Sequence, residues 1–119
     1  MAWIGLVLTA LVALMHFGFM ILEMFYWTTP YALKAFKMTL EGAQNSATLA
    51  ANQGLYNGFL AAGLVWAIMS GRRDVATFFL GCVIVAGVYG ALTANPRIFF
   101  VQAVPAILAL AATWVWGRG

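Results

Sequence analysis

Apolar residues gather in four long segments of the chain, at about 2–27, 47–70, 75–93 and 98–116. Each segment is close to the roughly 20 residues that a helix needs to cross the apolar core of a membrane. At 1.5 Å per residue the first would be about 39 Å long, more than the roughly 30 Å core, so we expect it to tilt or to emerge. The pattern predicts an all-α protein, a single-domain integral membrane four-helix bundle over 1–119.

The connections between these segments carry helix-start signals. Thr29-Pro30 has the form of a cap followed by a proline in the first turn, and Asn95-Pro96 repeats it before the fourth segment. Residues 28–46 mix apolar positions with scattered charges, a pattern typical of a helix that lies at the membrane surface. We therefore expect a short interfacial helix between the first and second spans.

Composition supports a membrane location. Hydrophobic residues make up 65% of the 119 positions and charged residues only 8%, whereas a soluble domain carries roughly 25% charged residues. This excludes a soluble monomer and makes the lipid bilayer the expected partner. The net charge of +3 comes from scattered basic residues, which form no patch dense enough for nucleic acid, so no nucleic-acid partner is predicted.

An even number of spans places both termini on one side of the membrane. One side would carry Arg72, Arg73 and Arg118, and the other Lys34, Lys37 and Arg97. This balance is even, and the short loop that holds two of the arginines favours cytoplasmic termini. No basic residue precedes Lys34, so we interpret the first apolar stretch as a retained span rather than a signal peptide. The predicted location is the bacterial cytoplasmic membrane.

Polar side chains within the apolar segments are the candidate functional residues, because they are costly inside a bilayer unless they find partners. His16 and Glu23 lie within about 20° of each other around the first helix, but roughly 10 Å apart along it. A bridging group must therefore lie between them, and we expect the polar side chains of the second span to point inward to supply it. The candidate ligand-binding residues are His16, Glu23, Trp27, Asn52, Gln53, Tyr56, Asn57 and Gln102.

Each of the two titratable candidates has a structural and a functional interpretation. Glu23 is either solvated at the membrane surface or a buried carboxyl group paired with polar neighbours. His16 is either a neutral imidazole bonded to an amide or to Tyr56, or a proton shuttle. These two residues are the candidate catalytic acid and base. They supply at most two metal ligands and one haem ligand, so no metal and no cofactor are predicted.

Small residues form stripes at helical spacing. Gly54 and Gly58 in the second span, and Ala86 and Gly90 in the third, have the small-xxx-small pattern that lets helices approach closely. The stripes predict packing within the bundle or contacts in a homo-oligomer. Cys82 is interpreted as a small core or lipid-facing side chain rather than a reactive thiol.

The fourth predicted span contains Gln102 and, three residues later, Pro105. Pro105 leaves the carbonyl group of Val101 without its usual helical donor. We expect Gln102 either to help repair this break or to join the polar group of the second span. Both alternatives remain open at this point.

These residues resemble a known family. The resemblance rests on His16, on the runs 22–25, 27–30 and 86–90, on Gln102 with Pro105, and above all on the run 50–64, AANQGLYNGFLAAGL. In these positions the chain is similar to the small bacterial membrane proteins catalogued as domain of unknown function thirteen hundred and four. The resemblance covers nearly the whole chain. It implies a four-helix membrane protein of about this length and no particular function.

Three functions fit this pattern. The first is binding or transport of a small molecule or ion at the intramembrane polar pocket, with the carboxyl and imidazole groups suited to proton coupling. The second is a membrane-embedded enzyme that acts on a lipophilic substrate with Glu23 and His16 as acid and base. The third is an accessory subunit whose polar groups only specify packing. Whether the protein is an enzyme is left open by the sequence.

Overall fold

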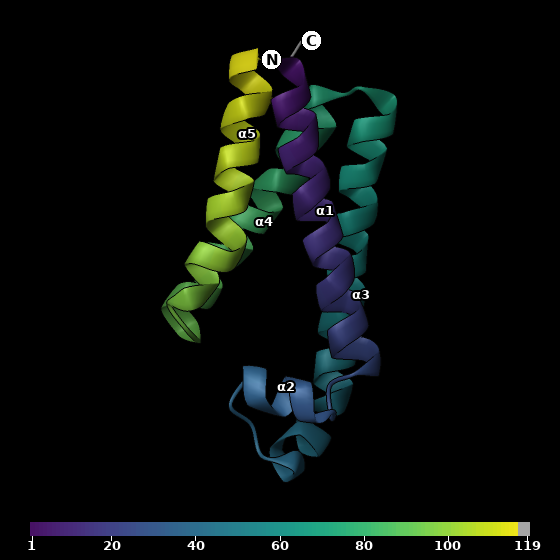
Figure 1. Ribbon diagram of the computed structural model, residues 1–119, viewed down its shortest axis with the longest axis vertical. Helices are drawn as coiled ribbons and strands as arrows, with labels where there is room; N and C mark the ends of the chain where they lie inside the picture. Colours follow the sequence, from purple (N-terminus) through teal and green to yellow (C-terminus); the bar gives the residue numbers. More distant parts are fainter. Residues whose placement is uncertain (117–119) are drawn as a thin grey trace. The chain divides into compact units, whose positions relative to one another are not determined.

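The computed structural model describes residues 1–116, and every regular element in that part of the chain is a helix. In order, the elements are α1 (Ala2–Phe25), α2 (Pro30–Ala35), α3 (Leu40–Ser70), α4 (Arg73–Thr93), the π-helix η1 (Phe99–Ala103) and α5 (Val104–Trp116) (Figure 1). The all-α prediction is confirmed for the described residues. Arg118, which entered the charge comparison, lies outside them.

Three helical stretches are long and apolar enough to cross a membrane: α1, α4, and the stretch Phe99–Trp116 that joins η1 to α5. The predicted second span is also helical and belongs to α3, the longest helix with 31 residues. α3 is not among the three stretches, because its carboxamides and hydroxyl groups lower its hydropathy. The structure thus supports three apolar helices, and the four-span bundle remains a prediction.

The connection expected at residues 28–46 is partly helical. Thr29 caps α2, accepting a hydrogen bond from the backbone N of Ala32 at 3.5 Å, and Pro30 opens the helix as predicted. α3 then begins at Leu40, well before the expected start near 47. The reason is a second cap, in which Thr39 Oγ1 accepts a hydrogen bond from the backbone N of Gly42 at 3.0 Å. The sequence interpretation had assigned residues 40–46, about two turns of α3, to the interfacial segment.

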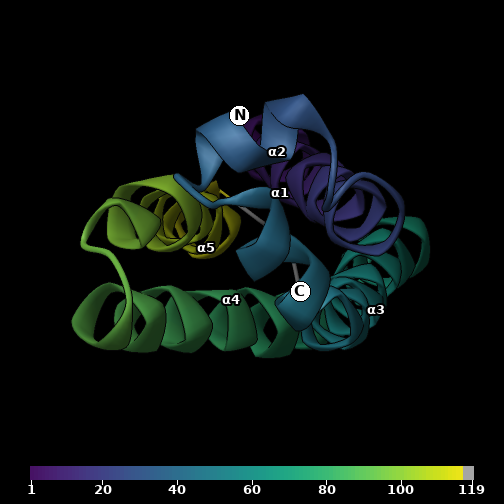
Figure 2. The same ribbon diagram turned by 90° about the horizontal axis from the view of Figure 1, so that it is seen from below.

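The helices contribute to two compact units. One unit consists of Met1–Leu14 together with the described residues from Leu60 onward, and the other of Met15–Phe59. In the first unit, α4 packs against η1 and α5, and Figure 2 shows α4 and α5 beside each other. The core of this unit includes Val12, Leu64, Leu80 and Val83, each at most 1% exposed. Burial of these aliphatic side chains holds the α1, α3 and α4 segments of the unit together.

Close helix contact in the first unit depends on a small residue of α4. A Cβ atom added at Gly87 would lie 2.8 Å from the backbone N of Ala103, which is fully buried. Backbone atoms cannot move aside as a flexible side chain can, so only glycine fits at this position. The small-residue pattern of the third predicted span is therefore used within the chain. Association of two copies through Ala86 and Gly90 remains a prediction.

The helix widens to a π-helix just before Pro105. η1 covers Phe99–Ala103, and the backbone N of Val104 donates to the carbonyl oxygen of Phe99, five residues earlier. In a regular α-helix the ring of Pro105 would clash with the carbonyl group of Val101. The wider turn is a common accommodation of such a break. The backbone therefore rearranges to accommodate the proline, which the sequence did not reveal. Gln102 lies within the rearranged turn.

A tight turn joins α3 to α4. Gly71 has φ +66°, a left-handed conformation that favours glycine at the end of a helix. Arg72 follows and donates to both carboxylate oxygens of Asp74, at 3.2 and 2.7 Å. This hydrogen bond raises the pKa of Arg72 above its ordinary value. The turn therefore keeps a charged guanidinium group that is already paired.

Candidate functional site

The central contact of the second unit is a hydrogen bond between α1 and α3. Asn57 of α3 is 6% exposed, and its Nδ2 donates to Oε1 of Glu23 at 2.5 Å. Glu23 itself is half-buried, near the end of α1. The contact joins the only carboxyl group of α1 to a buried amide of the amide-rich run. Of the partners that the sequence suggested for Glu23, the structure brings Asn57 to it.

Gly54 makes this contact possible. A Cβ atom added there would lie 2.8 Å from Cγ of Met24, 3.0 Å from Cβ of Glu23 and 3.1 Å from the carbonyl oxygen of Met20. Gly54 stands one turn before Asn57 on the same side of α3, so the close approach of the backbones brings the amide within reach of the carboxyl group. Gly58 also faces α1, where an added Cβ would meet Sδ of Met20 at 2.6 Å. This stripe is used inside the chain, and a homo-oligomer contact through it remains a prediction.

His16 is the other titratable candidate, and it is buried at 1% exposure. Its ring meets the ring of Phe19 edge to face, with centroids 5.2 Å apart at an angle of 70°. It lies about two turns from Glu23 along α1. The structure therefore places the imidazole in a packed interior.

Three of the predicted site residues are exposed on α3. Asn52 donates from Nδ2 to the carbonyl oxygen of Thr48 in its own helix at 2.9 Å. Tyr56 is 62% exposed and stacks edge to face on Phe59, and Gln53 is exposed as well. The inward orientation expected for these three side chains is not observed in this chain. The strip that contains Gly54 packs on α1 instead, because small residues allow the closest approach of two helices.

Trp27 lies just after the end of α1 in the second unit. Its indole Nε1 donates to Oγ of Ser46 at 3.0 Å, and its ring packs on Phe36 with centroids 5.0 Å apart. Ser46 in turn donates to the carbonyl oxygen of Gly42 at 2.8 Å. Trp27 thus ties the end of α1 to the first turns of α3. The sequence did not single out Ser46. The only available signal was that a half-buried indole N–H group usually has an acceptor.

Gln102 and Cys82 belong to the other unit. Gln102 lies half-buried in η1, and its membership in a polar site with the α3 amides remains a prediction. Cys82 lies half-buried on α4 with a free thiol. Among residues 1–116, no group of three His, Cys, Asp or Glu side chains lies close enough together to hold a metal ion.

An open groove of about 360 Å³ lies in the second unit. Met24 lines it from α1, while Thr48, Ala51 and Asn52 line it from α3. Glu23 does not line this groove. The groove offers the amide of Asn52 and the hydroxyl group of Thr48 to a polar molecule on the exposed side of α3, beside Met24.

The chain is similar to proteins of one family. Residues 10–114 match the family described as "Protein of unknown function (DUF1304)". A relative from Lactococcus lactis subsp. lactis (strain IL1403), described as "Uncharacterized protein YpaA", is 36% identical over 118 residues, which cover 96% of this chain and 99% of the relative. No solved structure matches the chain. Because the family match extends over most of the sequence, the chain belongs to this family of proteins of unknown function.

Proposed function

We propose that this chain is a multi-pass membrane protein that binds a small polar molecule or ion beside Glu23 and couples binding to the transfer of a proton. The hydrogen bond from Asn57 to Glu23 is the observation that carries the proposal. An ionisable side chain on an apolar helix of spanning length is expensive to keep, and in membrane proteins such residues mark substrate or proton pathways. The proposed location is the bacterial cytoplasmic membrane, with both termini on the cytoplasmic side.

The pair has unused hydrogen-bonding capacity. Within residues 1–116, Oε2 of Glu23 and Oδ1 of Asn57 take part in no hydrogen bond. Both atoms accept hydrogen bonds, and a carboxyl group can exchange its proton while the amide holds it in place. A ligand with N–H or O–H groups, or a small cation, would complete both acceptors.

The two alternatives gain less support. An enzyme with His16 and Glu23 as acid and base requires both residues beside an apolar substrate pocket. The apolar pocket of the first unit is lined by neither residue. An accessory subunit needs only the packing function of the Glu23–Asn57 bond. A measurement of proton transfer distinguishes the accessory role from the proposed function, because only the proposed function requires Glu23 to exchange a proton.

Chemical labelling tests whether Glu23 is a proton-exchanging carboxyl group in the membrane. Dicyclohexylcarbodiimide is apolar and reacts with protonated carboxyl groups. We expect it to label Glu23 in proteoliposomes and to leave Glu41 unlabelled, because Glu41 is exposed in the first turn of α3. Labelling should fall as the pH rises.

Proton flux tests the coupling itself. Proteoliposomes that contain a pH-sensitive dye are challenged with a panel of amides, amino acids, polyols and alkali cations. We expect one class to drive proton movement in the wild type and not in Glu23→Gln, which keeps the shape and one acceptor but has no exchangeable acidic proton. Glu41→Gln is the matched control and should behave as the wild type. Equal flux in Glu23→Gln and wild type would refute the coupling and favour the accessory role.

A further inference from the structure

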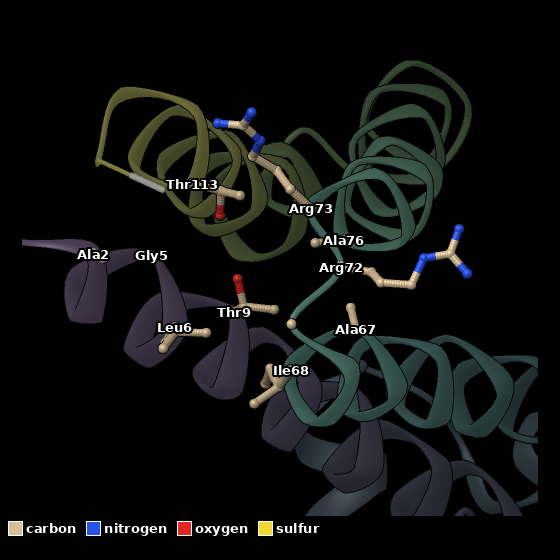
Figure 3. Close-up of a pocket in the computed structure, with 11 residues that line it drawn as sticks. Ala2, Gly5, Leu6, Thr9, Ala67, Ile68, Arg72, Arg73, Ala76 and Thr113 are labelled. Atoms are coloured by element: carbon tan, nitrogen blue, oxygen red, sulfur yellow. The ribbon is translucent and has the colours of Figure 1, made fainter. Parts of the chain in front are cut away.

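The first unit contains a pocket of about 240 Å³ at the end where α1 begins and α5 ends. Small residues from three helices line it, including Gly5 on α1, Ala67 on α3 and Ala76 on α4. Thr9 and Thr113 are its hydroxyl-bearing residues, and Figure 3 shows their oxygen atoms pointing toward each other across it. The pocket therefore has apolar walls with two hydroxyl groups.

Thr9 is an exception among the threonines of this unit. Thr77, Thr93 and Thr113 each donate to the carbonyl oxygen four residues earlier, at 2.8, 2.7 and 2.7 Å. This is the usual way in which a helix satisfies a threonine hydroxyl. The hydroxyl group of Thr9 is part of a side chain only 3% exposed, yet it makes no hydrogen bond with any of residues 1–116. Its oxygen is not one of the fully buried unpartnered polar atoms of residues 1–116, so it is accessible from the pocket. A molecule that enters the pocket can therefore be its hydrogen-bond partner.

Thr113 complements Thr9 chemically. Its hydroxyl proton is used in the hydrogen bond to Ala109, so its oxygen can only accept from a ligand. Thr9 can still donate. A single hydroxyl group placed between the two could accept from Thr9 and donate to Thr113. A ketone or an ether could satisfy only Thr9.

The arginines at the rim do not supply a charged partner for a ligand. Arg72 is paired with Asp74 at 2.7 Å, and the guanidinium carbon of Arg73 lies 4.0 Å from the ring centroid of Trp114. In Figure 3 both guanidinium groups point away from Thr9. Arg72 and Arg73 line the pocket, but their guanidinium groups are engaged with Asp74 and Trp114, so the pocket fits a neutral ligand rather than an anion.

We propose that this pocket binds a small, neutral, membrane-soluble alcohol or phenol, whose apolar body fills the space and whose hydroxyl group bridges Thr9 and Thr113. The size agrees with this class. An apolar cavity of about 150 Å³ holds benzene, so 240 Å³ has room for a fused pair of rings or a short branched chain. A lone water molecule, which occupies about 30 Å³, would satisfy the hydroxyl groups and leave the apolar walls without contacts.

Two probes that differ only in the hydroxyl group test the proposal: 1-naphthol and naphthalene. The full chain in lipid nanodiscs is dialysed to equilibrium against each probe, and binding to empty nanodiscs is subtracted. We expect saturable binding of 1-naphthol about tenfold tighter than that of naphthalene, the effect of one to two neutral hydrogen bonds. Thr9→Val should reduce 1-naphthol affinity to the level of naphthalene and leave naphthalene binding unchanged.

Two further variants keep the test decisive. Thr113→Val removes the acceptor and should lower 1-naphthol affinity several-fold. Thr93→Val makes the same chemical change at an exposed threonine at the end of α4, outside the pocket lining, and should change nothing. A cooperative thermal transition confirms that each variant is folded. The proposal is overturned if neither probe binds saturably, if both bind equally to the wild type, or if Thr9→Val binds 1-naphthol as the wild type does.

Discussion

Two of the polar side chains of α1, Glu23 and Thr9, have contrasting surroundings. Glu23, near its end, receives a hydrogen bond from the buried amide of Asn57. Thr9, near its start, is more deeply buried and has no hydrogen-bond partner within residues 1–116. The first arrangement joins two helices, whereas the second leaves a polar group that lines an open space. Paired polar groups therefore contribute to the packing of this protein, and the unpaired one marks a place where something else is expected to bind.

The largest effect on stability is expected at Gly54, which allows α3 to approach Glu23 on α1. Gly54→Leu should destabilise the folded state by about 3 kcal/mol, the upper end of the usual overpacking range, because Cβ alone would press on the carbonyl oxygen of Met20. Thermal unfolding in detergent measures the effect. Gly18→Leu on α1 is the matched control, since no described atom lies within 4 Å of an added Cβ there. It should be neutral or stabilising.

Gly58 sharpens the same test. An added Cβ would meet Sδ of Met20, a flexible side-chain atom, rather than backbone. Gly58→Leu should therefore lower the stability less than Gly54→Leu does. It should lower the stability more than Val65→Leu, which is the reference because it adds only one methylene group. Equal losses at Gly54 and Gly18 would show that the close contact of α1 with α3 is absent in the purified protein.

Removing the carboxyl group tests the paired side of the comparison directly. Glu23→Leu should cost about 1–3 kcal/mol of stability, because the buried amide of Asn57 loses its acceptor. Glu23→Gln should retain most of the stability, since a carboxamide oxygen still accepts from Nδ2. The double variant Glu23→Leu with Asn57→Leu should recover part of the loss. No recovery would mean that the hydrogen bond is not what makes Glu23 important for stability.

Thr9→Val tests the unpaired side, with the opposite sign and the smallest effect. Valine has nearly the same shape and no hydroxyl group, so the ligand-free protein should gain at most about 1 kcal/mol of stability. The same substitution at Thr113 should bring no such gain, because it removes an existing hydrogen bond to Ala109. Calorimetry of the delipidated protein in detergent measures both. A loss of stability in Thr9→Val would show that the hydroxyl group is already satisfied.

The helical class and most helix starts followed from the sequence by itself. Apolar segments of spanning length predict helices whatever their packing, and the Thr29-Pro30 cap is a local signal that needs no tertiary contact. About two turns at the start of α3 were missed, because Thr39 lies in a stretch that was interpreted as a charged connection. The π-helix before Pro105 was missed as well, because several backbone rearrangements can accommodate a proline.

The polar residues could be found from the sequence, but not their assignment to faces. Asn52, Gln53, Tyr56 and Asn57 all occur within two turns of α3, and each is costly inside a membrane. Only Asn57 reaches Glu23, because Gly54 determines which side of α3 meets α1. The sequence did not identify Thr9 as a candidate, because a threonine hydroxyl in an apolar helix usually donates a hydrogen bond to a carbonyl group of its own helix. Composition and periodicity thus determined the helices and the all-α class. The tertiary packing of small residues decided which helix faces meet, and with them the Glu23–Asn57 pair and the Thr9 pocket.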